Sequence, residues 1–276
     1  LARERVMGEM EKALTRSRRP SRCFEALREM GQLEPWLKEV AALIGVKQRA
    51  DCHPEGDAWT HTMLVVDEAA KLRDEAKNPT GLMLAALLHD VGKAVAMQEK
   101  DGVIHAYGHE TAGVPLAEDF LRRLTGEKAL CRYVLNMVEL HMKPNMYAAQ
   151  NSGQKAWNRL FDRSACPEDL LLLAKADHRG RINAAPNAET ERMIRTRLSA
   201  FEEMMARPHI TGAGNSAGGG NGAAARRSAP AQAGRGEEGG RAAADAPVRR
   251  GLCRYERLIS MGEDAEKPRP FSIWEK

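Results

Sequence analysis

The sequence predicts an all-α protein, and three observations lead to this fold class. Aromatic residues make up only 5% of the 276 residues, so a core must be built mostly from Leu, Met, Ala and Val. Such cores are usually helical. Apolar residues recur at helical spacing along residues 1–207, and no segment there shows the sustained alternation of a half-buried strand. This length is enough to enclose a sizeable core.

The expected helices follow one another along this stretch. Val6, Met10 and Leu14 are spaced by four residues and predict the first helix. Asp57 and Asn78 precede apolar runs as N-cap residues do, and residues 100–102 have the composition of a turn. The predicted helices cover residues 3–14, 21–30, 36–43, 57–72, 81–90, 108–124, 128–141, 153–163, 168–178 and 188–205.

The composition changes abruptly after the predicted helices. Residues 212–251 contain 11 Gly and 12 Ala, and Val248 is their only large apolar residue. Because such a segment cannot bury enough surface to offset the entropy of ordering, we expect a disordered linker over residues 208–251. Residues 252–276 regain aromatic and aliphatic residues and form a tail that either docks or stays loose. Residues 1–50 are expected to be a helical segment that precedes the main domain at residues 51–207.

Charge, hydropathy and cysteine usage exclude several classes of protein. The formal net charge is +4, but residues 51–207 hold 20 basic and 23 acidic residues, which argues against a large basic face for nucleic acid. An arginine cluster is better explained as a solvated helix end than as a phosphate contact: Arg16, Arg18, Arg19 and Arg22.

No membrane or secreted protein is expected. The longest apolar run, Leu82–Leu88, is far short of the roughly 20 residues that cross a bilayer, and no signal peptide is apparent. The five cysteines are scattered without a CxxC pair, which favours a reducing, cytoplasmic compartment. Because the sequence begins with Leu rather than Met, we expect that residues precede it.

A cluster of potential metal ligands is the main functional signal. His89 and Asp90 end an apolar helix, and imidazole with carboxylate is the ligand pair that suits divalent first-row metals. One His-Asp pair is weak support, because a helix end needs polar partners in any case. Further candidates lie on other predicted helices: His61, His109, His141 and Asp177.

The order of these residues resembles that of the HD-domain metal-dependent phosphohydrolases. Two segments narrow the resemblance to the HD region of bacterial tRNA nucleotidyltransferases, the CCA-adding enzymes. They are HPEGDAWTHT at residues 53–62 and ADHRGR at residues 176–181. PHITG at residues 208–212 resembles the start of that family's last segment, and residues 1–50 resemble its helical connection to the polymerase head. The likeness covers roughly residues 1–212 and implies a helical HD-domain bundle.

The sequence also departs from that family. The Gly-Ser turn and paired-aspartate motif of the polymerase head do not occur, so CCA addition is not expected from this chain alone. The apolar segment that should follow residue 212 is replaced by the Gly/Ala-rich linker. The chain is therefore either a piece of a longer enzyme, completed by a nucleotidyltransferase head, or a free-standing HD protein.

The resemblance implies a role for each candidate residue. His61, His89, Asp90 and Asp177 are expected to hold a first divalent ion. In a two-metal arrangement Asp90 would bridge, and the second ion would be held by His109 and His141. The resemblance leaves the ion open among Mn, Ni, Mg, Co and Fe.

Two cations near these ligands are candidates for binding the substrate phosphate. Lys93 lies one helical turn after Asp90, close enough to neutralise a phosphate oxygen, although a plain surface lysine is an equally good interpretation. Arg181 would share a face with Asp177 only if the helix continued through Gly180. A turn role is favoured for His53 and Glu55.

Three functions remain open at this level. The first is hydrolysis of 2′,3′-cyclic phosphodiester or nucleotide phosphomonoester groups, linked to tRNA 3′-end processing or repair. The second is hydrolysis of free deoxynucleotides, as in other HD proteins. The third is a tRNA-binding body of a split or truncated CCA-adding enzyme, in which any metal would be structural. The sequence does not determine the oligomeric state.

Overall fold

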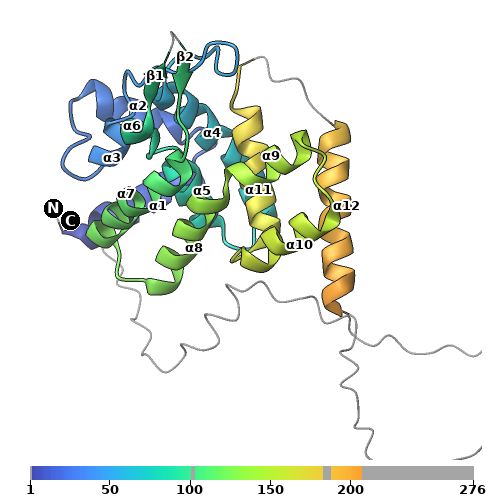
Figure 1. The fold of residues 1–276 in the computed structure, drawn as a ribbon. Coiled ribbons are helices and arrows are strands. Elements are labelled where there is room, and N and C mark those ends of the chain that lie inside the picture. Colours follow the sequence, from blue (N-terminus) through green and yellow to red (C-terminus); the bar gives the residue numbers. More distant parts are fainter. Residues whose placement is uncertain (1, 101–102, 183–187, 207–276) are drawn as a thin grey trace, which may run out of the picture.

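The computed structural model describes residues 2–100, 103–182 and 188–206, most of which are helical (Figure 1). The α-helices are α1 (Arg3–Arg16), α2 (Ser21–Glu29), α3 (Lys38–Ala41), α4 (Ala58–Leu72), α5 (Pro79–Leu88), α6 (Lys93–Ala96), α7 (His109–Leu124), α8 (Lys128–Leu140), α9 (Met142–Ala149), α10 (Gln154–Arg163), α11 (Pro167–Arg179) and α12 (Ala188–Ala206). A 3₁₀ turn, η1 (Arg73–Glu75), follows α4, and a hairpin of β1 (Gln98–Lys100) and β2 (Val103–His105) follows α6. The predicted all-α fold class is confirmed for this part of the chain.

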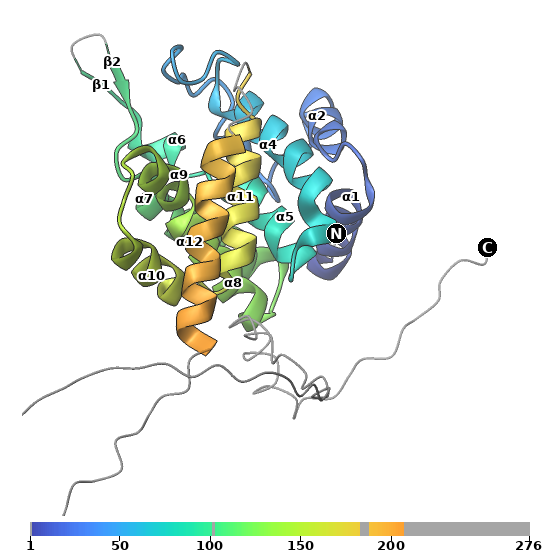
Figure 2. The ribbon, with the colours of Figure 1, turned by 90° about the vertical axis from the view of Figure 1, so that its right-hand side faces the viewer.

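Helix α5 forms the centre of the core. All of its residues from Gly81 to Leu88 are buried, and helices α1, α4, α8 and α11 pack around it. A helix that is apolar on every side needs such an all-round cover. Helix α12 lies outside this core and runs beside α11, as Figure 2 shows. The polar residues that follow α5 therefore emerge in the middle of the bundle.

Local capping explains where the two most important helices begin. The Asp57 carboxylate accepts a hydrogen bond from the backbone N–H of Thr60 at 2.9 Å and so caps α4. The Asn78 side chain accepts one from Gly81 N–H at 2.9 Å, and Pro79 occupies the first turn of α5. Both caps satisfy a donor that has no partner inside the helix. The predicted N-caps of both helices are confirmed, although α5 begins at Pro79 rather than at Gly81.

Two glycines allow helices to approach one another closely beside the candidate ligands. A Cβ atom on Gly92 would lie 2.0 Å from the carbonyl oxygen of His109. A Cβ atom on Gly180 would lie 2.5 Å from Cγ2 of Val65 on α4. Because no other residue fits at such distances, these glycines bring the start of α7 to the start of α6, and the end of α11 to α4.

The structure corrects several expectations. A short hairpin is present, with Gln98 opposite His105, although no strand was expected; three-residue strands are too short to show alternation. Helix α9 was missed, because Pro144 lies in its first turn, where proline is tolerated. The third expected helix, at residues 36–43, shrinks to α3.

Some expectations lie outside the described residues. These are the linker and tail at residues 208–276, and residues 101–102 of the predicted turn. Across the part of the chain that is described, no helix combines the length and apolar character that a membrane span requires.

Candidate metal centre

The six predicted ligands converge from five helices that are distant in sequence. His61 lies in α4, His89 and Asp90 follow α5, His109 begins α7, His141 follows α8, and Asp177 lies near the end of α11. Each is at most 5% exposed. Their assignment as ligands stays a prediction, but the structure does bring these side chains together.

Asp90 lies at the centre of this group. Its Oδ2 atom is 3.2 Å from Nε2 of His89 and 3.7 Å from Nε2 of His61. Its Oδ1 atom is 3.2 Å from Nε2 of His109 and 3.7 Å from Nε2 of His141. The two oxygens therefore face different pairs of imidazoles, and each pair with Asp90 has ligand atoms close enough to hold one ion.

Asp177 completes the first of these pairs. Its Oδ1 atom lies 3.1 Å from Nε2 of His61. Its Oδ2 atom faces the other way, toward Nδ2 of Asn145 at 3.4 Å and Nη2 of Arg181 at 3.5 Å. One oxygen thus faces the imidazole cluster and the other faces the neighbouring side chains of α9 and the residues after α11.

Backbone carbonyls fix the orientation of three imidazoles. The Nδ1 atoms of His89, His109 and His141 lie 2.9, 2.7 and 2.7 Å from the carbonyl oxygen of the residue three positions earlier. An imidazole that donates from Nδ1 keeps a lone pair on Nε2, which is the form that binds a metal. The same contact, to a carbonyl three residues earlier, therefore presents all three Nε2 atoms to Asp90.

Unsatisfied polar atoms show that a cation fits this cluster. The Nε2 atoms of His89, His109 and His141 are buried without a hydrogen-bond partner among the described residues. Buried polar atoms are rarely left in this state, so several together call for a ligand. Imidazole nitrogen and carboxylate oxygen are suitable donors for a divalent transition metal.

Glu55 orients the imidazole of His61 through the ring nitrogen that faces away from Asp90. The sequence did not predict this role. The fully buried carboxylate of Glu55 accepts from Nδ1 of His61 at 2.8 Å and from Nδ1 of His53 at 2.8 Å. It also accepts from the backbone N–H of Ile182 at 3.3 Å. Burial opposes ionisation, but the bonds to His61 and His53 outweigh it and lower the pKa of Glu55 to about 2. The turn role expected for His53 and Glu55 is therefore incomplete; their position before His61 was the available signal.

Lys93 belongs to the cluster and is not a surface lysine. It is 7% exposed, and its Nζ lies 2.6 Å from Oδ2 of Asp90 and 2.5 Å from Oε1 of Gln48. Arg181 lies beyond the helix, since α11 ends at Arg179 with Gly180 as its C-cap. The helix does not continue through Gly180, yet the Arg181 side chain still reaches Asp177. Phosphate contact by either cation stays a prediction.

The electrostatics favour charged carboxylates in this buried place. Burial would raise the pKa of Asp90, but His89 and Lys93 outweigh it and hold the pKa well below its usual range. The pKa of Asp177 is likewise lowered against burial, by His61 and Arg181. Burial lowers the pKa of His141, which favours the neutral form that a metal ligand needs.

Comparisons with known proteins agree with this geometry. Residues 58–182 match the family model described as HD domain. This range contains all six predicted ligands and lies inside the domain expected at residues 51–207.

Multifunctional CCA proteins are among the similar curated proteins. The one from Actinobacillus pleuropneumoniae serotype 5b is 36% identical over 190 residues, which cover 66% of this chain and 44% of that protein. The one from Burkholderia cenocepacia strain HI2424 is 37% identical over 223 residues, covering 78% and 52%. The chain thus spans about half the length of these relatives. The protein carries an HD domain that resembles the HD region of the multifunctional CCA proteins.

Proposed function

We propose that this chain is a metal-dependent phosphohydrolase. One observation carries the proposal: the two oxygens of Asp90 face two separate imidazole pairs, as a carboxylate that bridges two cations would. His61 and His89 would serve the first ion together with Asp177. His109 and His141 would serve the second. The unsatisfied Nε2 atoms support this assignment.

The chain's own residues fit the needs of phosphoryl transfer, which depends on positioning and charge stabilisation more than on covalent help. Divalent ions bound here would polarise a phosphoryl oxygen and lower the pKa of a water molecule. Glu55 keeps Nε2 of His61 directed at the centre by accepting from its Nδ1. Lys93, whose ammonium lies against Asp90, is placed to offset negative charge that a phosphate brings.

The proposed substrates are 2′,3′-cyclic phosphodiester or nucleotide phosphomonoester groups, linked to tRNA 3′-end processing. The link to tRNA is supported by the resemblance of the segments around His61 and Asp177 to the CCA-adding enzymes, and the relatives named multifunctional CCA proteins agree with it. A nucleotidyltransferase head is a proposed partner on the same ground. A cytoplasmic location accompanies this proposal.

The two other candidate functions make different demands on the cluster. A tRNA-binding body does not need a set of unsatisfied buried nitrogens around a central carboxylate, so the observed cluster favours an enzyme. A deoxynucleotide hydrolase would use the same cluster, and only the choice of substrate separates it from our proposal.

The test uses the full chain, freed of metal with a chelator and then loaded with Mn²⁺, Ni²⁺ or Mg²⁺. We expect bound metal and hydrolysis of bis(p-nitrophenyl) phosphate, and faster turnover of a 2′,3′-cyclic nucleotide than of a deoxynucleoside triphosphate. A chain that binds no metal and hydrolyses neither phosphodiester would contradict the proposal. Affinity for tRNA at two salt concentrations is the companion measurement for the binding-body alternative.

A further inference from the structure

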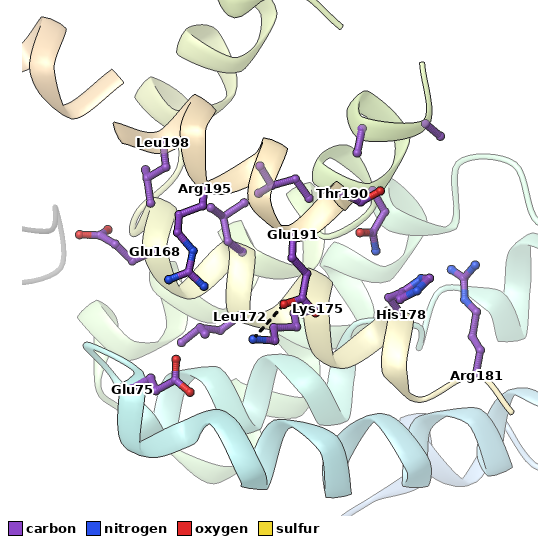
Figure 3. Close-up of a pocket in the computed structure, with 15 residues that line it drawn as sticks. Glu75, Glu168, Leu172, Lys175, His178, Arg181, Thr190, Glu191, Arg195 and Leu198 are labelled. Atoms are coloured by element: carbon purple, nitrogen blue, oxygen red, sulfur yellow. Dashed lines mark ion pairs between the residues drawn. The ribbon is translucent and has the colours of Figure 1, made fainter. Parts of the chain in front are cut away.

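A cavity of about 470 Å³ lies beside the metal centre, between α9, α11, α12 and η1 (Figure 3). This volume falls within the range of small-molecule sites. Its walls combine apolar side chains with charged ones, and none of the six predicted ligands is among the residues that line it.

Two residues of the cavity wall connect it to the metal centre. Asn145 and Arg181 line the cavity, and both contact Oδ2 of Asp177, at 3.4 and 3.5 Å. The other oxygen of Asp177 faces Nε2 of His61. The Asp177 carboxylate therefore lies between these two lining residues and the imidazole cluster.

The cavity is electrostatically asymmetric. Arg181 and His178 lie together at one end, whereas Glu75 and Glu168, with Arg195 beside Glu168, lie at the other (Figure 3). The buried Nε atom of Arg181 has no hydrogen-bond partner among the described residues. A cation with a spare donor beside the centre favours an anionic group at that end, and carboxylates at the far end favour hydrogen-bond donors such as amino groups.

Apolar side chains lie between these two ends. Leu171 and Leu172 come from α11, and Ile194 and Leu198 come from α12. An ion pair between Lys175 and Glu191, at 3.4 Å, joins the same two helices across the cavity (Figure 3). The space thus suits a flat, largely apolar body that carries amino groups at one end and a phosphate at the other.

We infer that this cavity binds the nucleoside part of a nucleotide substrate while its phosphate lies at the Asp177 end, beside the metal centre. The inference rests on the proposed phosphohydrolase function and extends it, because it names where the nucleoside lies and which helices select it. A nucleobase with an amino group, such as adenine, matches the carboxylates of Glu75 and Glu168.

The test fills the cavity without touching the predicted ligands. Ala148→Trp places an indole in the cavity from α9, and Ala149→Trp does so from an exposed position at its edge. Ala26→Trp, on the exposed side of α2 and far from α12, is the matched control (Figure 1). Calorimetry measures binding of adenosine 3′-monophosphate to the full chain freed of metal, so that hydrolysis adds no heat, and thermal melting identifies any variant that fails to fold.

We expect each cavity variant to weaken nucleotide binding about tenfold or more, equal to 1.4 kcal/mol. Ala26→Trp should bind as the unchanged chain does, and hydrolysis of bis(p-nitrophenyl) phosphate, which has no nucleoside, should stay within about twofold. Equal nucleotide affinity in a folded cavity variant, or no binding by the unchanged chain, overturns the inference. If Ala148→Trp does not fold, Ala149→Trp decides.

The failure of the proposed function has a different signature. A chain that binds adenosine 3′-monophosphate in the cavity but does not hydrolyse bis(p-nitrophenyl) phosphate retains the nucleoside site and loses the phosphohydrolase assignment. The converse result retains the phosphohydrolase and removes the nucleoside site.

Discussion

Two buried aspartates at opposite ends of α11 have very different surroundings. Asp169 is 0% exposed and accepts hydrogen bonds from Lys77 N–H, Asn78 N–H and the hydroxyl of Tyr133, at 2.8, 2.9 and 2.6 Å. Asp177 is 3% exposed and lies against an imidazole cluster with several unsatisfied atoms. Burial of a carboxylate is therefore not in itself a sign of function. What distinguishes the metal centre is the set of polar atoms that the protein leaves without partners.

The largest expected effect is the loss of metal and activity when the centre loses its bridging charge. Asp90→Asn keeps the size of the side chain but removes the carboxylate that faces both imidazole pairs. We expect no stoichiometric metal in elemental analysis and turnover lowered about 1,000-fold or more, since bound ions contribute several kcal/mol to the transition state. The helical circular-dichroism spectrum should persist. Full metal content and turnover would show that Asp90 is not a ligand.

Asp169 should show the opposite pattern. Asp169→Ala leaves the Tyr133 hydroxyl and two backbone N–H groups buried without an acceptor, so we expect the free energy of unfolding to fall by about 3–5 kcal/mol. Metal content per folded molecule should not change. Denaturant unfolding and elemental analysis measure the two quantities on the same sample. If Asp169→Ala were as stable as the unchanged chain but had lost its metal, Asp169 would belong to the metal centre, as Asp177 is proposed to.

A change at Glu55 tests how far metal binding depends on a residue that contacts a predicted ligand without being one itself. Its carboxylate accepts a hydrogen bond from Nδ1 of His61. In Glu55→Gln the amide can still accept from His61, but it no longer stabilises the imidazole by charge. We expect metal affinity and turnover to fall about 10–100-fold, with a stoichiometric site still reached at high metal concentration. Metal titration followed by activity separates this from loss of the site. An affinity equal to that of the unchanged chain would reduce Glu55 to a structural link between the loop and Ile182.

The six candidate ligands could be named from the sequence because their order is a property of the chain, and each lies near the beginning or the end of a helix. The role of Glu55 was not, because it depends on how the loop before α4 folds against residues after α11. Close packing at Gly92 and Gly180 was also hidden, since a single sequence does not show which glycines touch another helix. The cavity is formed only when α12 packs beside α11, so no local pattern announces it. The strands β1 and β2 have three residues each, which is too few to show the alternation of polar and apolar residues that identifies a strand in a sequence.

The smallest expected effect concerns the cap of α4, the helix that carries His61. Thr60 and Gly45 donate to Asp57, and although burial opposes them, together these bonds lower the pKa of Asp57 below its ordinary value. Asp57→Ala should reduce the free energy of unfolding by about 1 kcal/mol, as the loss of a side-chain cap usually does.

Because Asp57 is charged, its contribution to the free energy of unfolding should depend on pH. The contribution of Asn78, which caps α5 and is neutral, should not. A carboxyl whose pKa is lowered by folding stabilises the protein above its unfolded pKa, near 4, and loses that contribution as the pH falls through the folded value. The stability difference between the unchanged chain and Asp57→Asn should therefore be constant above about pH 5 and shrink at lower pH. Urea unfolding across this range, on metal-free protein, measures it. If the stability difference between the unchanged chain and Asp57→Asn did not depend on pH, the cap would act through its hydrogen bonds alone. The negative charge of Asp57 would then contribute nothing to the stability of α4.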